Sequence, residues 1–248
     1  MIKYQTIFIA VLIGIIPALG ASWWFLTNGQ KKIGINLLLK TFFWGVLTAI
    51  PASIFQIINI EGKSGNMVVS LLQQLVHGLN NYFITHSLVP FLFVALIEEF
   101  SKGLGIFLSL RSFARSKKAS NLKINPGILV GIIVGLAFGV TENGVYFANN
   151  FGGQIENSIV SIVVLRFLLS TSAHMIYSGL FGAFLVDLFV AKGVVKKILS
   201  LGGMSLPIII HTTFNILVTT SNLGILSIPL LLVGLVILSF KTFWTASD

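Results

Sequence analysis

Long apolar stretches follow one another along the chain, separated by short polar segments. Each of seven stretches is at least as long as the ~20 apolar residues that a transmembrane helix needs. Between the second and third stretches, apolar side chains recur at helical spacing beside glutamine and histidine, from Asn66 to Thr85, which is typical of an amphipathic helix at the membrane interface. We therefore predict an all-α polytopic membrane protein, a bundle of about seven transmembrane helices plus one interfacial amphipathic helix. The seven stretches are residues 4–26, 35–60, 87–110, 126–149, 158–190, 197–220 and 223–243.

The composition agrees with this architecture. Hydrophobic residues make up 55% of the chain and charged residues 9%, whereas soluble domains carry roughly 25% charged residues. The 248 residues leave little length for a separate soluble domain, so we predict a single membrane domain over residues 1–248. The chain has no cysteine, which excludes disulfides, thiolate metal sites and a cysteine nucleophile.

The basic residues sort to one side of the predicted membrane. Eleven of the 16 Lys and Arg residues lie in or at the edges of the first, third and fifth loops or near the end of the last span. Because cytoplasmic loops carry the excess of Lys and Arg, we predict that the N-terminus lies outside and the C-terminus in the cytoplasm. This asymmetry accounts for the net charge of +9. We therefore expect the lipid bilayer as a partner and no nucleic acid.

Four of the seven acidic residues lie inside the predicted spans, namely Glu98, Glu99, Glu142 and Asp187. A charged side chain at the bilayer centre costs at least ~2.5–3.5 kcal/mol, so such residues are functional candidates. Asp187 lies near a helix end, close to Lys192, and we expect it to form a structural ion pair. The three glutamates are then the groups whose burial needs a functional reason.

The paired glutamates share a predicted helix with a lysine. Lys102 follows Glu98 by four residues and Glu99 by three, so its ammonium can reach either carboxylate. Taken alone, this could be a structural ion pair that lowers the cost of burial. Adjacent residues point about 100° apart on a helix, so the other carboxylate needs a further partner or keeps its proton. A carboxylate held near neutrality is what general acid–base catalysis requires.

A row of glycines indicates which way the side chain of Glu142 points. Four glycines, each four residues apart from 127 to 139, lie on one face of the fourth predicted span, and small residues at this spacing let a neighbouring helix pack closely. Glu142 follows the last of them by three residues, so we expect its carboxylate to point into the bundle. Arg166, in the next span, either pairs with Glu142 or extends toward the membrane surface.

Two histidines lie at similar predicted depths, His174 in the fifth span and His211 in the sixth, with Asn215 one turn after His211. A lone histidine in a membrane helix is more often an interior hydrogen-bonded residue than a catalyst. Two histidines and three glutamates near mid-membrane on four helices nevertheless predict a shared site. Hydroxyl residues in the same spans would help to admit water: Ser170, Thr171, Ser172, Thr212 and Thr213.

Four short motifs resemble those of the PrsW family of membrane proteases. Residues 98–102 (Glu-Glu-Phe-Ser-Lys) resemble its EExxK motif, and residues 138–142 resemble its FxxxE motif. Residues 174–182 resemble its third, histidine-bearing motif, and residues 211–215 its last, HxxxN. The motifs occur in order over residues 87–220, which we take as the catalytic core. The family is distantly similar to the CAAX prenyl protease and bacteriocin-processing superfamily.

The resemblance implies a bacterial cell-membrane enzyme that hydrolyses a peptide bond in a single-pass membrane protein, such as an anti-sigma factor, on the extracytoplasmic side. It implies that Glu98 or Glu99 activates the attacking water. The remaining motif residues would bind the water or a metal ion, stabilise the oxyanion or support the glutamates. These are Glu142 and His174 for the water or metal, His211 and Asn215 for the oxyanion, and Lys102, Asn143 and Arg166 as supports.

The resemblance leaves metal dependence open. The HExxH spacing that sets two metal ligands on one helix face is absent. Glu142, His174 and His211 could still hold a single divalent metal such as zinc. Our sequence interpretation slightly favours glutamate chemistry with no cofactor.

Two other functions are compatible with buried carboxylates and histidines. A proton-coupled transporter also uses such groups, but it predicts two related halves with broken helices, and the sequence shows no convincing repeat. A non-catalytic membrane scaffold would tolerate Glu98→Gln and Glu99→Gln, whereas a protease would lose turnover with at least one of them.

Overall fold

The computed structural model describes residues 35–60, 89–114, 126–150, 166–219 and 226–246. No strand occurs in these ranges, and the helical architecture is confirmed for them. The helices are α2 (Ile35–Ile60), α4 (Val89–Ala114), α5 (Pro126–Asn150), a π-helical turn η2 (Phe167–Thr171) that runs directly into α7 (Ser172–Val190), α8 (Val194–Thr219) and α9 (Ser227–Ala246).

Seven spans are not established by the described residues, which contain six long helices. Four of them, namely α2, α5, α7 with its preceding turn, and α8, are long and apolar enough to cross a membrane. Helix α4 is not among these four, because Glu98, Glu99 and Lys102 interrupt its apolar sequence. The predicted first span at 4–26 and the interfacial helix at 66–85 lie outside the described residues.

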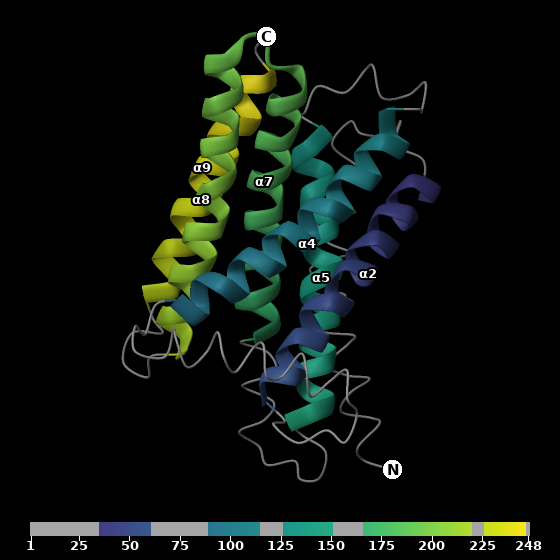
Figure 1. Cartoon of the computed structure of the whole chain (residues 1–248), viewed down its shortest axis with the longest axis vertical. Helices are drawn as coiled ribbons and strands as arrows, with labels where there is room; N and C mark the ends of the chain where they lie inside the picture. The colour runs from purple at the N-terminus through teal and green to yellow at the C-terminus, as the bar shows by residue number, and fades with distance from the viewer. Residues whose placement is uncertain (1–34, 61–88, 115–125, 151–165, 220–225, 247–248) are drawn as a thin grey trace.

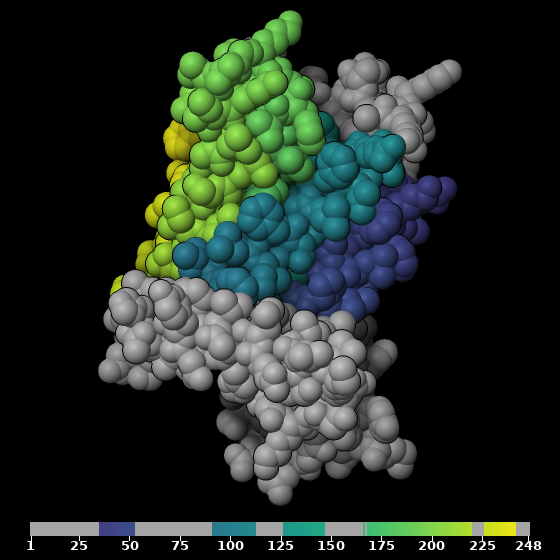
Figure 2. Space-filling model, in the orientation of Figure 1, coloured from purple at the N-terminus to yellow at the C-terminus, as the bar shows by residue number. Residues whose placement is uncertain are grey.

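The helices form a bundle in which α4 crosses obliquely in front of α5 and α7 (Figure 1). Helix α2 packs against α4 and α5 on one side, while α8 and α9 pack against α7 on the other. In the space-filling view, α4 lies on the surface between α8 and α2 (Figure 2). Phe100 and Leu104 of α4 are exposed, as lipid-facing residues of a membrane helix would be.

The glycine stripe of α5 packs directly on α7, as the sequence predicts. A Cβ atom on Gly127 would lie 2.0 Å from the carbonyl oxygen of Gly182, and one on Gly131 would lie 2.0 Å from that of Ser178. One on Gly135 would lie 2.2 Å from the carbonyl oxygen of His174. The two helices therefore run antiparallel with their backbones in contact, and the seam ends beside the turn that carries His174.

Candidate active site

The structure brings the polar motif residues of four helices together inside the bundle. Glu98, Glu99 and Lys102 come from α4, Glu142 and Asn143 from α5, His174 from α7 and His211 from α8. All of these side chains are buried. The predicted convergence in space is therefore observed, and the helices that carry the motifs pack against one another.

Lys102 forms its ion pair with only one of the two adjacent glutamates. Its Nζ atom donates to Glu99 Oε1 at 2.5 Å and lies 3.0 Å from Nδ1 of His174. It also lies over the ring of Phe138, 4.8 Å from the centroid. The ammonium thus links α4 to α7 at a fully buried position, and it pairs with Glu99 rather than with Glu98.

Glu99 also holds His211. Nδ1 of His211 lies 2.7 Å from Glu99 Oε1, and a carboxylate that accepts a hydrogen bond from an ammonium group at the same oxygen is an acceptor here as well. The Nδ1–H of His211 therefore donates to Glu99, which leaves Nε2 as the lone-pair nitrogen of the neutral ring. That Nε2 atom lies 3.6 Å from Glu98 Oε2. Tyr177 stacks on the other side of the His211 ring, with centroids 5.1 Å apart.

His174 and Glu142 form a second imidazole–carboxylate pair. Nε2 of His174 lies 2.7 Å from Glu142 Oε2, and Arg166 Nη2 donates to Glu142 Oε1 at 3.1 Å. Of the two expectations for Arg166, pairing with Glu142 is therefore the one observed. Nε of Arg166 donates to Asn143 Oδ1 at 2.9 Å, and the amide of Asn143 donates to Thr171 Oγ1 at 3.1 Å.

Arg166 and His174 lie on either side of a π-helical turn, and both contact Glu142. Residues Phe167–Thr171 form a wider turn before α7 begins at Ser172, and such turns are frequent at functional sites. The sequence gives no signal for this turn. Tyr146 was not predicted either. The centroid of its ring lies 3.8 Å from Cζ of the Arg166 guanidinium, but in the sequence an aromatic residue at this position resembles an ordinary core residue.

A cavity of about 890 Å³ opens beside these groups. Its lining includes Glu98, Glu142, His174, His211 and Asn215, whereas Glu99 and Lys102 lie behind this wall. The two glutamates of the EExxK segment therefore differ: one faces the cavity and the other holds a histidine.

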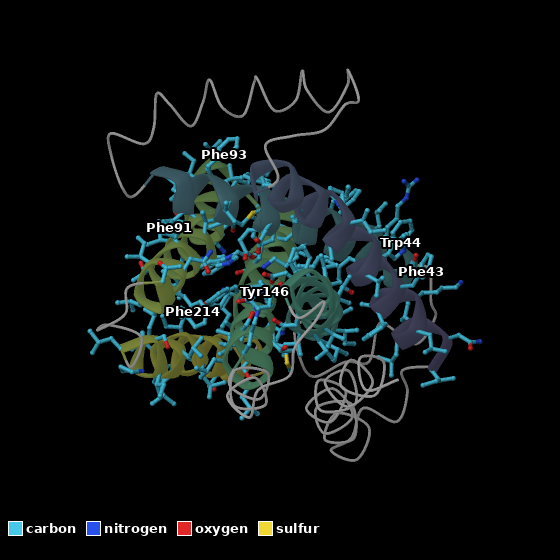
Figure 3. The ribbon with its side chains drawn as sticks, turned by 90° about the horizontal axis from the view of Figure 1, so that it is seen from below. Phe43, Trp44, Phe91, Phe93, Tyr146 and Phe214 are labelled. Carbon is cyan, nitrogen blue, oxygen red and sulfur yellow. The ribbon has the colours of Figure 1, made fainter. Side chains whose placement is uncertain are left out.

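Aromatic residues frame the cavity. Phe91 of α4, Tyr146 of α5 and Phe214 of α8 all line it. Viewed along the bundle, these three lie around a group of nitrogen- and oxygen-bearing side chains, whereas Phe43 and Trp44 of α2 lie apart (Figure 3). The cavity thus belongs to the half of the bundle formed by α4, α5, α7 and α8.

The donor atoms fit a divalent metal ion. Glu98, His174 and His211 each offer one ligand atom, and these atoms lie within 4.8 Å of one another. Two imidazoles and one glutamate form a known ligand set of catalytic zinc sites. His211 has one ring nitrogen beside the carboxylate of Glu99, which is the arrangement that orients metal-ligating histidines. His174 contacts Glu142 through Nε2 and Lys102 through Nδ1, so a metal ion would take the place of one of these two contacts. The structure thus favours Glu98 over Glu142 as the third ligand.

Two expectations about other polar residues change. Asp187 pairs with Lys241 of α9 rather than with Lys192, because α7 ends at Val190 and the chain leaves the helix before residue 192. Of the five hydroxyl residues expected to admit water, Ser170 lines the cavity. Thr212 and Thr213 instead donate to carbonyl oxygens of their own helix, four residues back.

Comparison with known proteins agrees with the motifs. The model of a family described as "PrsW family intramembrane metalloprotease" matches residues 34–244. The chain is 24% identical to "Protease PrsW" of Shouchella clausii (strain KSM-K16) over 211 residues, covering 85% of this chain and 83% of that relative. No solved structure matches the chain significantly. A bacterial relative and several apolar helices support a bacterial membrane protein. The chain belongs to the PrsW family of intramembrane metalloproteases and is a membrane protease.

Proposed function

We propose that the chain is an endopeptidase that hydrolyses a peptide bond of a membrane-anchored protein inside the described cavity. The observation that carries this proposal is the meeting of two carboxylates and two imidazoles at one buried cavity wall. A purely structural ion-pair network needs no adjoining space, whereas hydrolysis needs room for a peptide and for water.

Glu98, His174 and His211 would hold the metal ion. When bound, such an ion polarises a carbonyl and lowers the pKa of water. The resemblance gives His211 the alternative role of oxyanion donor. Its Nδ1–H is already committed to Glu99, so the neutral ring has no further proton to donate, and a ligand role suits it better.

Glu142 is then the carboxylate left to accept the proton of the attacking water. It lines the cavity, where Arg166 contacts its Oε1 atom and His174 its Oε2 atom. The family resemblance implies Glu98 or Glu99 for this role. Glu99 is the less suitable of those two, because it lies outside the cavity lining and its Oε1 accepts from both Lys102 and His211.

The reaction would run in two steps. The water oxygen bonds to the scissile carbonyl carbon, the carbonyl π electrons move onto its oxygen, and the water proton passes to Glu142. The C–N bond then breaks and the protonated Glu142 returns this proton to the leaving nitrogen, so that one peptide and one water give an acid and an amine. Asn215, which lines the cavity, would donate to the oxyanion, a contribution of roughly 2.7–4 kcal/mol in other enzymes.

The substrate would approach from the extracytoplasmic side. The cavity lining comes from the first half of α4, the end of α5, the start of α7 and the end of α8. With the predicted orientation, all of these lie toward the outer face. A single-pass membrane protein such as an anti-sigma factor, the substrate type implied by the family resemblance, would be cut near that face.

Metal content and turnover together test these roles. We expect purified Glu98→Gln to lose both bound metal and cleavage. We expect Glu142→Gln to retain metal but to lose turnover by about 10²–10⁴-fold, the usual contribution of a general base. Metal is measured by elemental mass spectrometry and cleavage with a membrane-anchored peptide. If metal were lost only in Glu142→Gln, Glu142 would be the metal ligand and Glu98 the general base.

Chelation and a double substitution test the enzyme class itself. A strong chelator should abolish cleavage, and added zinc should restore it. The variant with both Glu98→Gln and Glu99→Gln should be inactive. Unchanged cleavage in that variant would rule out this site as the catalytic centre, and it is the result that a non-catalytic scaffold predicts.

A further inference from the structure

We propose that the outer part of the cavity, between α4 and α8, is a binding subsite for a bulky apolar side chain next to the scissile bond. This proposal rests on the proposed function and adds the chemistry by which substrates are selected. The subsite is formed by Phe91 and Val94 of α4 together with Phe214 and Val218 of α8, all of which line the cavity.

Helical spacing puts the catalytic groups and these apolar groups on the same faces. On α4, Phe91, Val94 and Glu98 are three and four residues apart, so all lie on one side of the helix. On α8, His211, Phe214 and Val218 follow the same spacing. Seven residues separate Glu98 from Phe91, which corresponds to about 10 Å along the helix axis. The subsite therefore extends from the catalytic groups toward the mouth of the cavity.

Packing fixes Phe214, whereas Val218 on the same wall is 47% exposed. The ring of Phe214 is 6% exposed and lies edge-on to Tyr177, with centroids 6.2 Å apart at 70°. Both residues belong to the core formed by α5, α7, α8 and α9. Phe91 and Val94 are only half-buried, so the free space depends on their size.

The occupant follows from the lining. An apolar pocket that ends at hydrolytic groups binds the side chain beside the bond that is cut, and apolar pockets favour larger side chains until the space is filled. The cavity as a whole, of about 890 Å³, has room for a leucine or phenylalanine side chain together with the adjoining backbone. A small residue next to the scissile bond would leave part of this apolar surface unfilled. A charged residue there would lose its water without gaining a polar partner.

A substrate series measures the preference directly. Membrane-anchored peptides that differ only in the residue before the scissile bond, carrying Ala, Leu, Phe or Asp, are compared by kcat/KM. Wild-type protein should cleave the Leu and Phe peptides at least about tenfold better than the Ala peptide. Val94→Phe should bring the ratio of Phe to Ala close to one, and Phe91→Ala should raise it. A ratio does not depend on the fraction of folded protein, so a loss of stability in either variant leaves the test intact.

Phe107→Ala is the matched control, because Phe107 lies on the same helix with its ring toward Phe189 of α7 and outside the cavity lining. Its ratios should equal those of wild type. Wild-type ratios that are flat, or ratios unchanged by both subsite substitutions, would overturn the subsite. An absence of cleavage in wild type for every peptide that reaches the membrane would instead count against the proposed function.

Discussion

One ammonium group organises the buried charges of the site. Lys102 contacts both Glu99 and His174, and Glu99 in turn holds His211. The fully buried amine thereby links α4 to α7 directly, and to α8 through Glu99. Removing one member of a buried ion pair leaves the other charge uncompensated, which costs more than the pair itself contributes.

We therefore expect Lys102→Met to lower the free energy of unfolding by about 3–5 kcal/mol. Lys241→Met is the matched control, since its pair with Asp187 is partly exposed, at 24% and 27% of the two side chains, and such pairs contribute about 0–1 kcal/mol. Thermal unfolding in detergent, followed by tryptophan fluorescence, compares the two. Equal losses in both variants would contradict a central role for Lys102.

Residue contacts could be predicted from the sequence where they are local. The pairing of Lys102 with a neighbouring glutamate follows from helical spacing, although not which glutamate it chooses. The predicted pairing of Asp187 with Lys192 was wrong, because Lys192 is near in sequence but the observed partner, Lys241, comes from another helix. Tyr177 was missed, because an aromatic residue in an apolar run resembles ordinary core; its place three residues after His174 was the only signal.

At the scale of helices, the seam between α5 and α7 sets the position of the site. Backbone contact at Gly127, Gly131 and Gly135 brings α7 as close as two helices can come. Glu142 and His174 lie at the end of this seam, where Oε2 of Glu142 is 2.7 Å from Nε2 of His174. The glycine spacing predicts such a face, whereas the π-helical turn before α7 depends on tertiary contacts that no local pattern reports.

Gly131→Ala tests the seam. The new methyl carbon would lie 2.0 Å from the carbonyl oxygen of Ser178, so the helices must separate, and we expect a loss of several kcal/mol in stability together with a loss of cleavage. Gly144→Ala on the same helix is the control, since no atom of the described residues lies within 4 Å of its added methyl. It should be neutral or stabilising by up to about 1 kcal/mol, because alanine favours helix over glycine. Melting temperature and peptide cleavage are measured together; a stable, active Gly131→Ala would show that the seam can open without cost.

At the scale of the whole molecule, the cavity lies toward one end of the bundle. The ends of α5 and α8 and the start of α7 meet there, while the turn from α7 to α8 lies at the opposite end (Figure 1). The all-helical class and most helix bounds could be predicted from apolar length alone. The cavity could not, because it depends on how obliquely α4 crosses its neighbours.

The predicted orientation can be tested at the two ends of α8. The chain has no cysteine, so Thr219→Cys and Lys192→Cys each introduce a single thiol at an exposed position. Thr219 is the last residue of α8, and Lys192 lies two residues before its start, so the 26 residues of this helix, about 39 Å long, separate the two positions. In intact cells, a membrane-impermeant maleimide should label Thr219→Cys at once and Lys192→Cys only after permeabilisation. The reverse pattern would place the cavity on the cytoplasmic side.

The charges of α4 also have a consequence for biosynthesis. Each buried charge costs about 2.5–3.5 kcal/mol or more in a bilayer, and Glu98, Glu99 and Lys102 follow one another closely. Lys102 meets His174 72 residues later in the chain, and Glu99 meets His211 112 residues later. When α4 leaves the ribosome, these partners have not been made. We therefore expect the stable insertion of α4 to depend on the C-terminal helices that supply these partners.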